Sequence, residues 1–319
     1  MSRSGARGRE RRWSAEWCRG APAYRYNRCI DMVGIQAHTE TYWDGLARAY
    51  AALGPPLRPT RGEIAALERS VAAYAAQTGD RLLRGLMLGV TADIATMRWP
   101  ARCSLLAVDL SREMIRSVWP GDIAGVRRAV CGNWISLPTR PSSCDIAIGD
   151  GSMNCVSYPD GFRAVAASVF QALKSEGIYV ARCYAQPERK EEPAAVMESL
   201  AGRENPTFHH FKFRLLMAMQ RNVKEGVAVD EVYRYWAQYG LDPAVVAERQ
   251  GWDVEGVRDI QLYRGASTVH FFPTLEEQRS LLREYFDELS CSTDACVLGE
   301  RCPMLVLTPR RAAGGRPGT

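Results

Sequence analysis

Residues 82–109, LLRGLMLGVTADIATMRWPARCSLLAVD, contain the pattern that decides the fold. Residues 86–88 form an apolar run without alternation, which is typical of a strand buried on both faces of a parallel sheet. Gly89 allows a sharp turn, and a second apolar run over 105–108 ends in Asp109. This order of strand, turn, helix, strand and acid predicts a nucleotide-binding half, in which Asp109 accepts hydrogen bonds from the hydroxyls of a ribose.

The turn after the first strand, Gly89-Val90-Thr91-Ala92-Asp93, departs from the glycine-rich loop of dinucleotide-binding proteins. Thr91 stands where the second glycine of that loop lets the backbone approach a pyrophosphate. Asp93 would repel a pyrophosphate at a helix N-terminus that otherwise favours anions. A ligand with a ribose, an adenine and a cationic amino-acid tail suits this turn better. The chain here resembles the class I S-adenosylmethionine (SAM)-dependent methyltransferases, whose first motif is a looser version of the same loop.

Further landmarks follow the family in order and spacing. Met114 comes after a helix cap at Ser111, and the family places a hydrophobic residue here against adenine. Asn133 stands where many relatives have an acid that accepts from the adenine amino group, and its carbonyl oxygen can accept in the same way. Residues 172–180, ALKSEGIYV, resemble the family's leucine, basic residue, Pro-Gly-Gly and strand signature. The resemblance implies a Rossmann-like α/β fold: a mostly parallel seven-stranded sheet closed by a terminal antiparallel pair, with helices on both faces.

A further apolar strand, residues 145–149, delivers Asp150 and Gly151 to the carboxyl edge of the sheet. Ligands of open α/β sheets bind at this edge, where the strand order reverses. Asp150 is suited to lie near a sulfonium and Gly151 to let the backbone approach a methyl donor, although Asp150 is equally suited to cap a helix. The resemblance implies SAM as the cofactor. The residues expected to bind it are Gly89, Val90, Thr91, Asp109, Leu110, Met114, Asn133, Trp134, Asp150, Gly151 and Ser152.

Residues 208–214, FHHFKFR, are the densest mixture of aromatic and titratable side chains. A histidine with an ordinary pKa of about 6.5 can remove a proton from a nucleophile, which makes His209 and His210 candidates for the catalytic base. The alternative is that both belong to a buried stripe with the neighbouring phenylalanines. Arg214 and Lys212 are suited either to bind an acidic substrate or to face water.

Helices that precede the first strand cover the cofactor in this family. Trp43 and Tyr50 fall on one face of a helix that starts near Thr39, and Arg58 lies in the proline-rich connector that follows. These residues are therefore candidates to contact cofactor or substrate, Arg58 through a carboxylate. The alternative is that the aromatic side chains are core and the arginine is solvated.

The net charge of +5 is unevenly distributed: residues 1–31 carry +5 and the end from Arg310 carries +3, which leaves −3 for the rest. A mildly acidic core lacks the basic patch that nucleic-acid binding requires. No apolar run approaches the roughly 18 residues of a membrane span, and no signal peptide is evident, so we expect a cytoplasmic protein without a membrane or nucleic-acid partner. No histidine lies near the cysteine cluster Cys291, Cys296 and Cys302, so we expect no metal.

The domain organisation follows from these patterns. We expect a basic, disordered extension over residues 1–38, one methyltransferase domain over 39–308 and a disordered tail over 309–319. Within the domain, residues 39–80 are expected to form a helical lid. Residues 187–264 do not fit a sheet and are expected to form a helical insertion that closes a substrate cavity.

The predicted function is transfer of a methyl group from SAM to an oxygen, nitrogen or sulfur nucleophile of a small molecule. Most of the catalytic effect would come from alignment of donor and acceptor in a site closed to water. Three alternatives stay open: a non-catalytic protein that senses SAM or its demethylated product, a methyltransferase of proteins or nucleic acids, and an NAD-dependent oxidoreductase with an altered loop. The sequence does not fix the acceptor or the oligomeric state.

Overall fold

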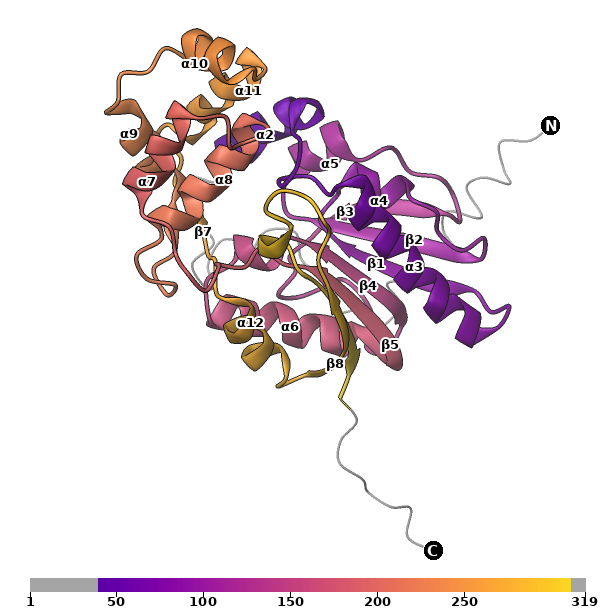
Figure 1. Ribbon diagram of the computed structural model, residues 1–319. Helices are drawn as coiled ribbons and strands as arrows, with labels where there is room; N and C mark the ends of the chain where they lie inside the picture. Colours follow the sequence, from indigo (N-terminus) through magenta and orange to yellow (C-terminus); the bar gives the residue numbers. More distant parts are fainter. Residues whose placement is uncertain (1–39, 311–319) are drawn as a thin grey trace, which may run out of the picture.

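A seven-stranded sheet forms the centre of the computed structural model, which describes residues 40–310 (Figure 1). The strand order is β3-β2-β1-β4-β5-β9-β8. Strands β1 to β5 pair in parallel, whereas β9 runs antiparallel between β5 and β8. The predicted Rossmann-like α/β fold is confirmed. The strands are β1 (Leu83–Leu88), β2 (Cys103–Asp109), β3 (Arg127–Cys131), β4 (Cys144–Asp150), β5 (Leu173–Arg182), β8 (Phe286–Ser292) and β9 (Met304–Pro309).

A different set of helices covers each face of the sheet. Side chains alternate along each strand, so successive residues pack against different helices. Leu86 and Leu88 pack on the face covered by α6 and α12, whereas Met87 packs on the face covered by α3, α4 and α5 (Figure 1). All three are almost fully buried, and burial of each side chain contributes about 1.5–3 kcal/mol. The unbroken apolar run is therefore a strand covered on both sides. The helices are α3 (Arg61–Thr78), α4 (Ala92–Thr96), α5 (Arg112–Val118), α6 (Asp160–Ala172) and α12 (Leu275–Leu282).

In the part of the chain that the structure describes, β1 is preceded by α2 (Glu40–Ala49), which the 3-10 turn η1 (Tyr50–Ala52) continues, and by α3. A capping box begins α3: the Thr60 hydroxyl accepts from the Glu63 N–H and the Glu63 carboxylate accepts from the Thr60 N–H, a pattern that Thr60 and Glu63 also mark in the sequence. The expected cap of the first helix, Thr39, lies outside the described residues.

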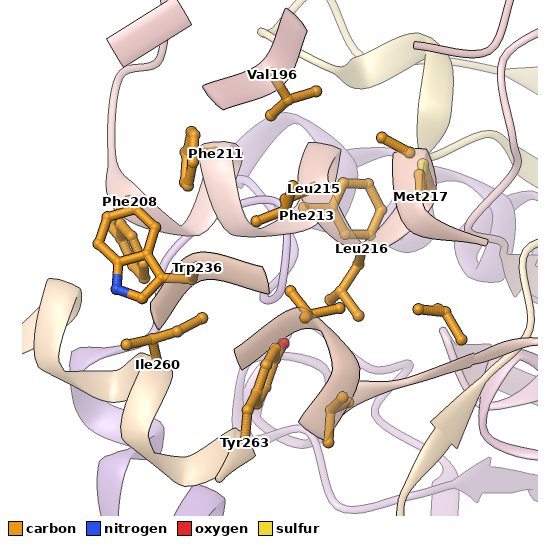
Figure 2. Packing of buried hydrophobic residues seen from close by; sticks show 14 of the residues in the cluster. Val196, Phe208, Phe211, Phe213, Leu215, Leu216, Met217, Trp236, Ile260 and Tyr263 are labelled. Atoms are coloured by element: carbon orange, nitrogen blue, oxygen red, sulfur yellow. The ribbon is translucent and has the colours of Figure 1, made fainter. Parts of the chain in front are cut away.

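Helices α7 to α11, between β5 and β7, build a separate core above the carboxyl edge of the sheet (Figure 1). Figure 2 shows the side chains of α8 meeting Trp236 of α9 and Ile260 of η4. A two-residue pair, β6 with β7, ties this part to the chain that returns to the sheet, an element that the sequence does not predict. The elements are α7 (Pro193–Glu198), η3 (Ser199–Ala201), α8 (Phe208–Met219), β6 (Val227–Ala228), α9 (Val229–Ala237), α10 (Pro243–Gln250), α11 (Val254–Arg258), η4 (Asp259–Tyr263) and β7 (Val269–His270).

The helices of the described part of the chain, residues 40–310, are too short or too polar to cross a lipid bilayer.

Candidate functional site

A cavity of about 140 Å³ lies between the carboxyl edge of the sheet and the helices above it. At the sheet end, Thr91 follows β1 and Asp150 ends β4, the two neighbouring strands at which the strand order reverses. The lining is Tyr42, Trp43, Leu46, Tyr50, Leu53, Leu57, Thr91, Met114, Asp150, Gly151, Cys155, Tyr184, Lys212, Phe213, Leu216, Tyr263, His270 and Phe272.

A buried ion network holds Asp150 in place. The guanidinium of Arg182, at the end of β5, donates to Asp150 Oδ1 over 2.8 Å and to Glu63 Oε1 over 2.7 Å. Its third nitrogen donates to the carbonyl of Pro56 over 2.7 Å. Burial alone would lower the pKa of Arg182, but Tyr184 and Asp150 raise it well above the usual value. The arginine therefore stays charged and joins β4, β5, α3 and the connector before α3.

Gly151 and Asn154 fix the conformation of the loop after β4. Gly151 has φ +60°, and a Cβ at this position would lie 2.5 Å from the ring of Tyr184. Asn154 donates to the carbonyls of Tyr184 and Phe271 and accepts from the Tyr184 N–H. This buried amide therefore fixes the loop against the end of β5 and the segment after β7.

The turn after β1 is tied to both neighbouring elements. Gly89 has φ +103°, a conformation that suits glycine. The Thr91 hydroxyl donates to Asp150 Oδ2 over 3.1 Å. Asp93, in the first turn of α4, accepts two hydrogen bonds from Arg58, over 2.8 and 3.0 Å. Arg58 thus contacts a carboxylate of the chain itself, and it does not line the cavity.

Asp109 ends β2 beside the cavity but outside its lining. One carboxylate oxygen, Oδ1, accepts from the Ser111 N–H over 2.8 Å, and the other lies 4.0 Å from where a Cβ of Gly89 would stand. Burial raises the pKa of Asp109 to about 7. Burial and the nearby charges of Asp109 and Asp150 raise the pKa of Cys155, which lines the cavity, to about 12. Asp109 is therefore close to the sheet end of the cavity.

Several other residues expected to bind the cofactor have different surroundings. Trp134 lies near Gly89 and its indole N–H donates to the Val108 carbonyl over 2.6 Å. The side-chain oxygen of Asn133 accepts from the N–H two residues further on. Val90 is buried in the core and Leu110 is exposed. Ser152 is buried with its hydroxyl beside Gly149. The structure brings none of these five to the cavity lining, whereas it does bring Thr91, Met114, Asp150 and Gly151 there.

Neither histidine of α8 lines the cavity. His209 Nε2 lies 3.3 Å from the Ala52 carbonyl oxygen, and burial lowers the pKa of this histidine to about 4. His210 Nδ1 lies 2.9 Å from the Thr207 hydroxyl, and burial lowers its pKa too. Arg214 pairs with Glu191 on another side of α8. Trp43 and Tyr50, by contrast, reach the cavity from α2 and η1.

Sequence reasoning missed two titratable residues that surround the cavity, Arg182 and His270. It did single out Lys212, which lies four residues from both Phe208 and Leu216 on an apolar stripe and which lines the cavity. No comparable local signal marks Arg182 or His270.

No protein-family model matches the chain, and no curated protein matches it. Among solved structures, it is similar to the N-methyltransferase NodS of Bradyrhizobium japonicum, crystallised with S-adenosylhomocysteine (SAH), at 11% identity and a TM-score of 0.45, over 85% of this chain and 100% of that one. A 1,6-didemethyltoxoflavin-N1-methyltransferase of Burkholderia thailandensis matches at 14% identity and a TM-score of 0.42, over 88% and 94%. A TehB-like SAM-dependent methyltransferase of Corynebacterium glutamicum matches at 12% identity and a TM-score of 0.41, over 86% and 99%. These similarities concern the fold alone.

Proposed function

We propose that this chain is a SAM-dependent methyltransferase that acts on a small molecule. The observation that carries the proposal is the position of the cavity, at the carboxyl edge of the sheet where the strand order reverses between β1 and β4. Open α/β sheets bind their ligands at this place. Asp109, at the end of the neighbouring strand β2, supplies a carboxylate for the hydroxyls of a ribose.

The charges at the sheet end favour a cationic ligand over a pyrophosphate. Arg182, Asp150 and Glu63 together carry one positive and two negative charges, so the buried network has a net charge of −1. Asp93 adds a carboxylate to the first turn of α4, where a dinucleotide would place its phosphates, and Arg58 neutralises it. A sulfonium and an ammonium suit this end of the cavity, whereas a pyrophosphate would be repelled.

SAM, when bound, supplies an electrophilic methyl group on its sulfonium. The chain's own contribution is to position the reactants: the Asp150 carboxylate stabilises positive charge, and Gly151 leaves space at the backbone. Trp43 and Tyr50 from the N-terminal helices and Phe213 from α8 enclose the cavity and exclude water. Because these helices lie over the site, the geometry favours a small acceptor over a macromolecular one.

Calorimetric titration of the full chain with SAM, SAH and NAD tests the proposal. We expect micromolar binding of SAM and SAH and none of NAD. Asp109→Asn should weaken SAH binding by roughly 10- to 100-fold, because a hydrogen bond to a charged acceptor is worth about 1.5–3 kcal/mol. The control is Asp80→Asn, which changes a carboxylate that is 90% exposed before β1 and should leave the affinity unchanged. Binding of NAD alone would point to an oxidoreductase, and no binding of any of the three would refute the proposal.

A further inference from the structure

A lysine lies at the helical end of the cavity. Lys212 is on α8, is 1% exposed and belongs to the cavity lining. Its Nζ atom lies 5.1 Å from the ring centre of Tyr263 and 6.0 Å from that of Phe208. These ring faces attract a cation, but they do not neutralise its charge.

Within residues 40–310, the Lys212 ammonium has no hydrogen-bond acceptor and no carboxylate within ion-pair distance. The charge of Asp259 acts on it through space, but the two side chains form no ion pair. Burial lowers the pKa of Lys212 to about 8, so the ammonium form still dominates at neutral pH. A buried charge without a partner is costly, and proteins keep such groups where a ligand or partner completes them.

The other titratable groups that line the helical end are uncharged at neutral pH. Burial lowers the pKa of His270 to about 4. Burial also raises the pKa values of Tyr42 and Tyr263. The cavity is therefore polarised: the sheet end carries the negative network of Asp150, and the helical end carries the positive charge of Lys212.

We propose that Lys212 binds the anionic group of the methyl acceptor, and that the acceptor is a small aromatic acid. An acid supplies the charge that the ammonium lacks, and its apolar ring fits the aromatic walls around it. A cationic amine is disfavoured, because it would share the cavity with both the ammonium and a sulfonium. The walls at this end are Tyr42, Trp43, Phe213, Tyr263, His270 and Phe272.

The assignment of Lys212 to the methyl acceptor rests on the proposed function, because it requires SAM to occupy the sheet end of the cavity. The amino-acid tail of SAM also carries a carboxylate, which is a second possible partner of Lys212. An experiment that measures cofactor and acid binding separately distinguishes the two.

The experiment measures binding of benzoate, salicylate and 1-naphthoate, and of their three neutral amides, to the full chain in the presence of saturating SAH. Binding is followed by calorimetry in the wild type and in Lys212→Met, which keeps most of the length of the side chain and removes its charge. The matched control is Lys224→Met, which removes an exposed charge from the same insertion. SAH affinity is measured for all three proteins without the acids.

We expect at least one acid to bind the wild type roughly tenfold or more tightly than its amide, as a charge-assisted hydrogen bond would produce. Lys212→Met should abolish this preference with unchanged SAH affinity, and Lys224→Met should retain it. The proposal is overturned if no acid binds the SAH-loaded wild type, if acid and amide bind equally, or if Lys212→Met keeps the preference. Loss of SAH affinity in Lys212→Met would assign the lysine to the cofactor instead. If SAH fails to bind the wild type while the acid preference is present, the methyltransferase proposal fails and the anion site stands.

Discussion

Replacement of Arg182 by methionine tests the central role of the buried ion network. The side chain of Arg182 is 1% exposed, and those of its partners Glu63 and Asp150 are 3% and 6% exposed. Methionine fills most of the volume but leaves two buried carboxylates without their cation. Removal of one partner of a buried pair typically costs about 3–5 kcal/mol. For a domain of this size the midpoint of thermal unfolding should fall by roughly 10 °C.

The assay is thermal and urea denaturation followed by circular dichroism. Arg98→Met is the matched control, because the side chain of Arg98 is 88% exposed in its pair with Glu68 and its loss should leave the midpoint unchanged. Adding Glu63→Gln to Arg182→Met should recover part of the lost stability, since one of the two carboxylates then disappears. If Arg182→Met unfolds at the same temperature as Arg98→Met, the network does not carry the stability that we assign to it.

Three further predictions concern the cavity. SAH affinity should increase between about pH 6 and pH 8, because burial holds the pKa of Asp109 at about 7 and the ionised form is the better acceptor for ribose hydroxyls; calorimetry should show no such increase in Asp109→Asn. Lys212→Met should stabilise the fold at pH 7 by about 3 kcal/mol, because a pKa lowered from 10.5 to about 8 reflects that cost of burying an ammonium. The wild type regains this stability as pH rises from 8 to 10.5, so urea denaturation should show a smaller advantage at pH 10. Gly151→Ala should lower the thermal midpoint and weaken SAH binding, since its Cβ would meet the ring of Tyr184 at 2.5 Å with φ at +60°.

The sheet could be predicted from the sequence because its signals are local. The apolar runs of β1 and β2 are buried on both faces, as strands inside a parallel sheet are, and the turn residues beside them separate these runs from a buried helix. The capping box of Thr60 and Glu63 is equally local and marks the start of α3 within a single turn. The strand order confirmed the fold that these patterns predict.

The site was predicted in part, for a physical reason. Thr91 and Asp150 could be placed at the sheet edge because each directly follows a recognisable strand, whereas Arg182 and Glu63 meet across 119 residues of sequence. In α8 the side of the helix that faces the cavity could not be predicted. Because this helix is buried on nearly all sides, its apolar pattern does not show which residue faces the cavity. Of the polar residues His209, His210 and Lys212, only the lysine faces it.

The connector between η1 and α3 is attached to the sheet and to α4 by charged and polar contacts. Arg58 joins the connector to Asp93 of α4, with both side chains about one quarter exposed. Two residues earlier in the connector, the backbone carbonyl of Pro56 accepts hydrogen bonds from Arg182 and Tyr184. The connector before α3 is therefore joined to the sheet at two places of different exposure. Salt screens the partly exposed pair of Arg58 and Asp93 more than the buried contacts at Pro56, so high ionic strength should weaken the first attachment before the second.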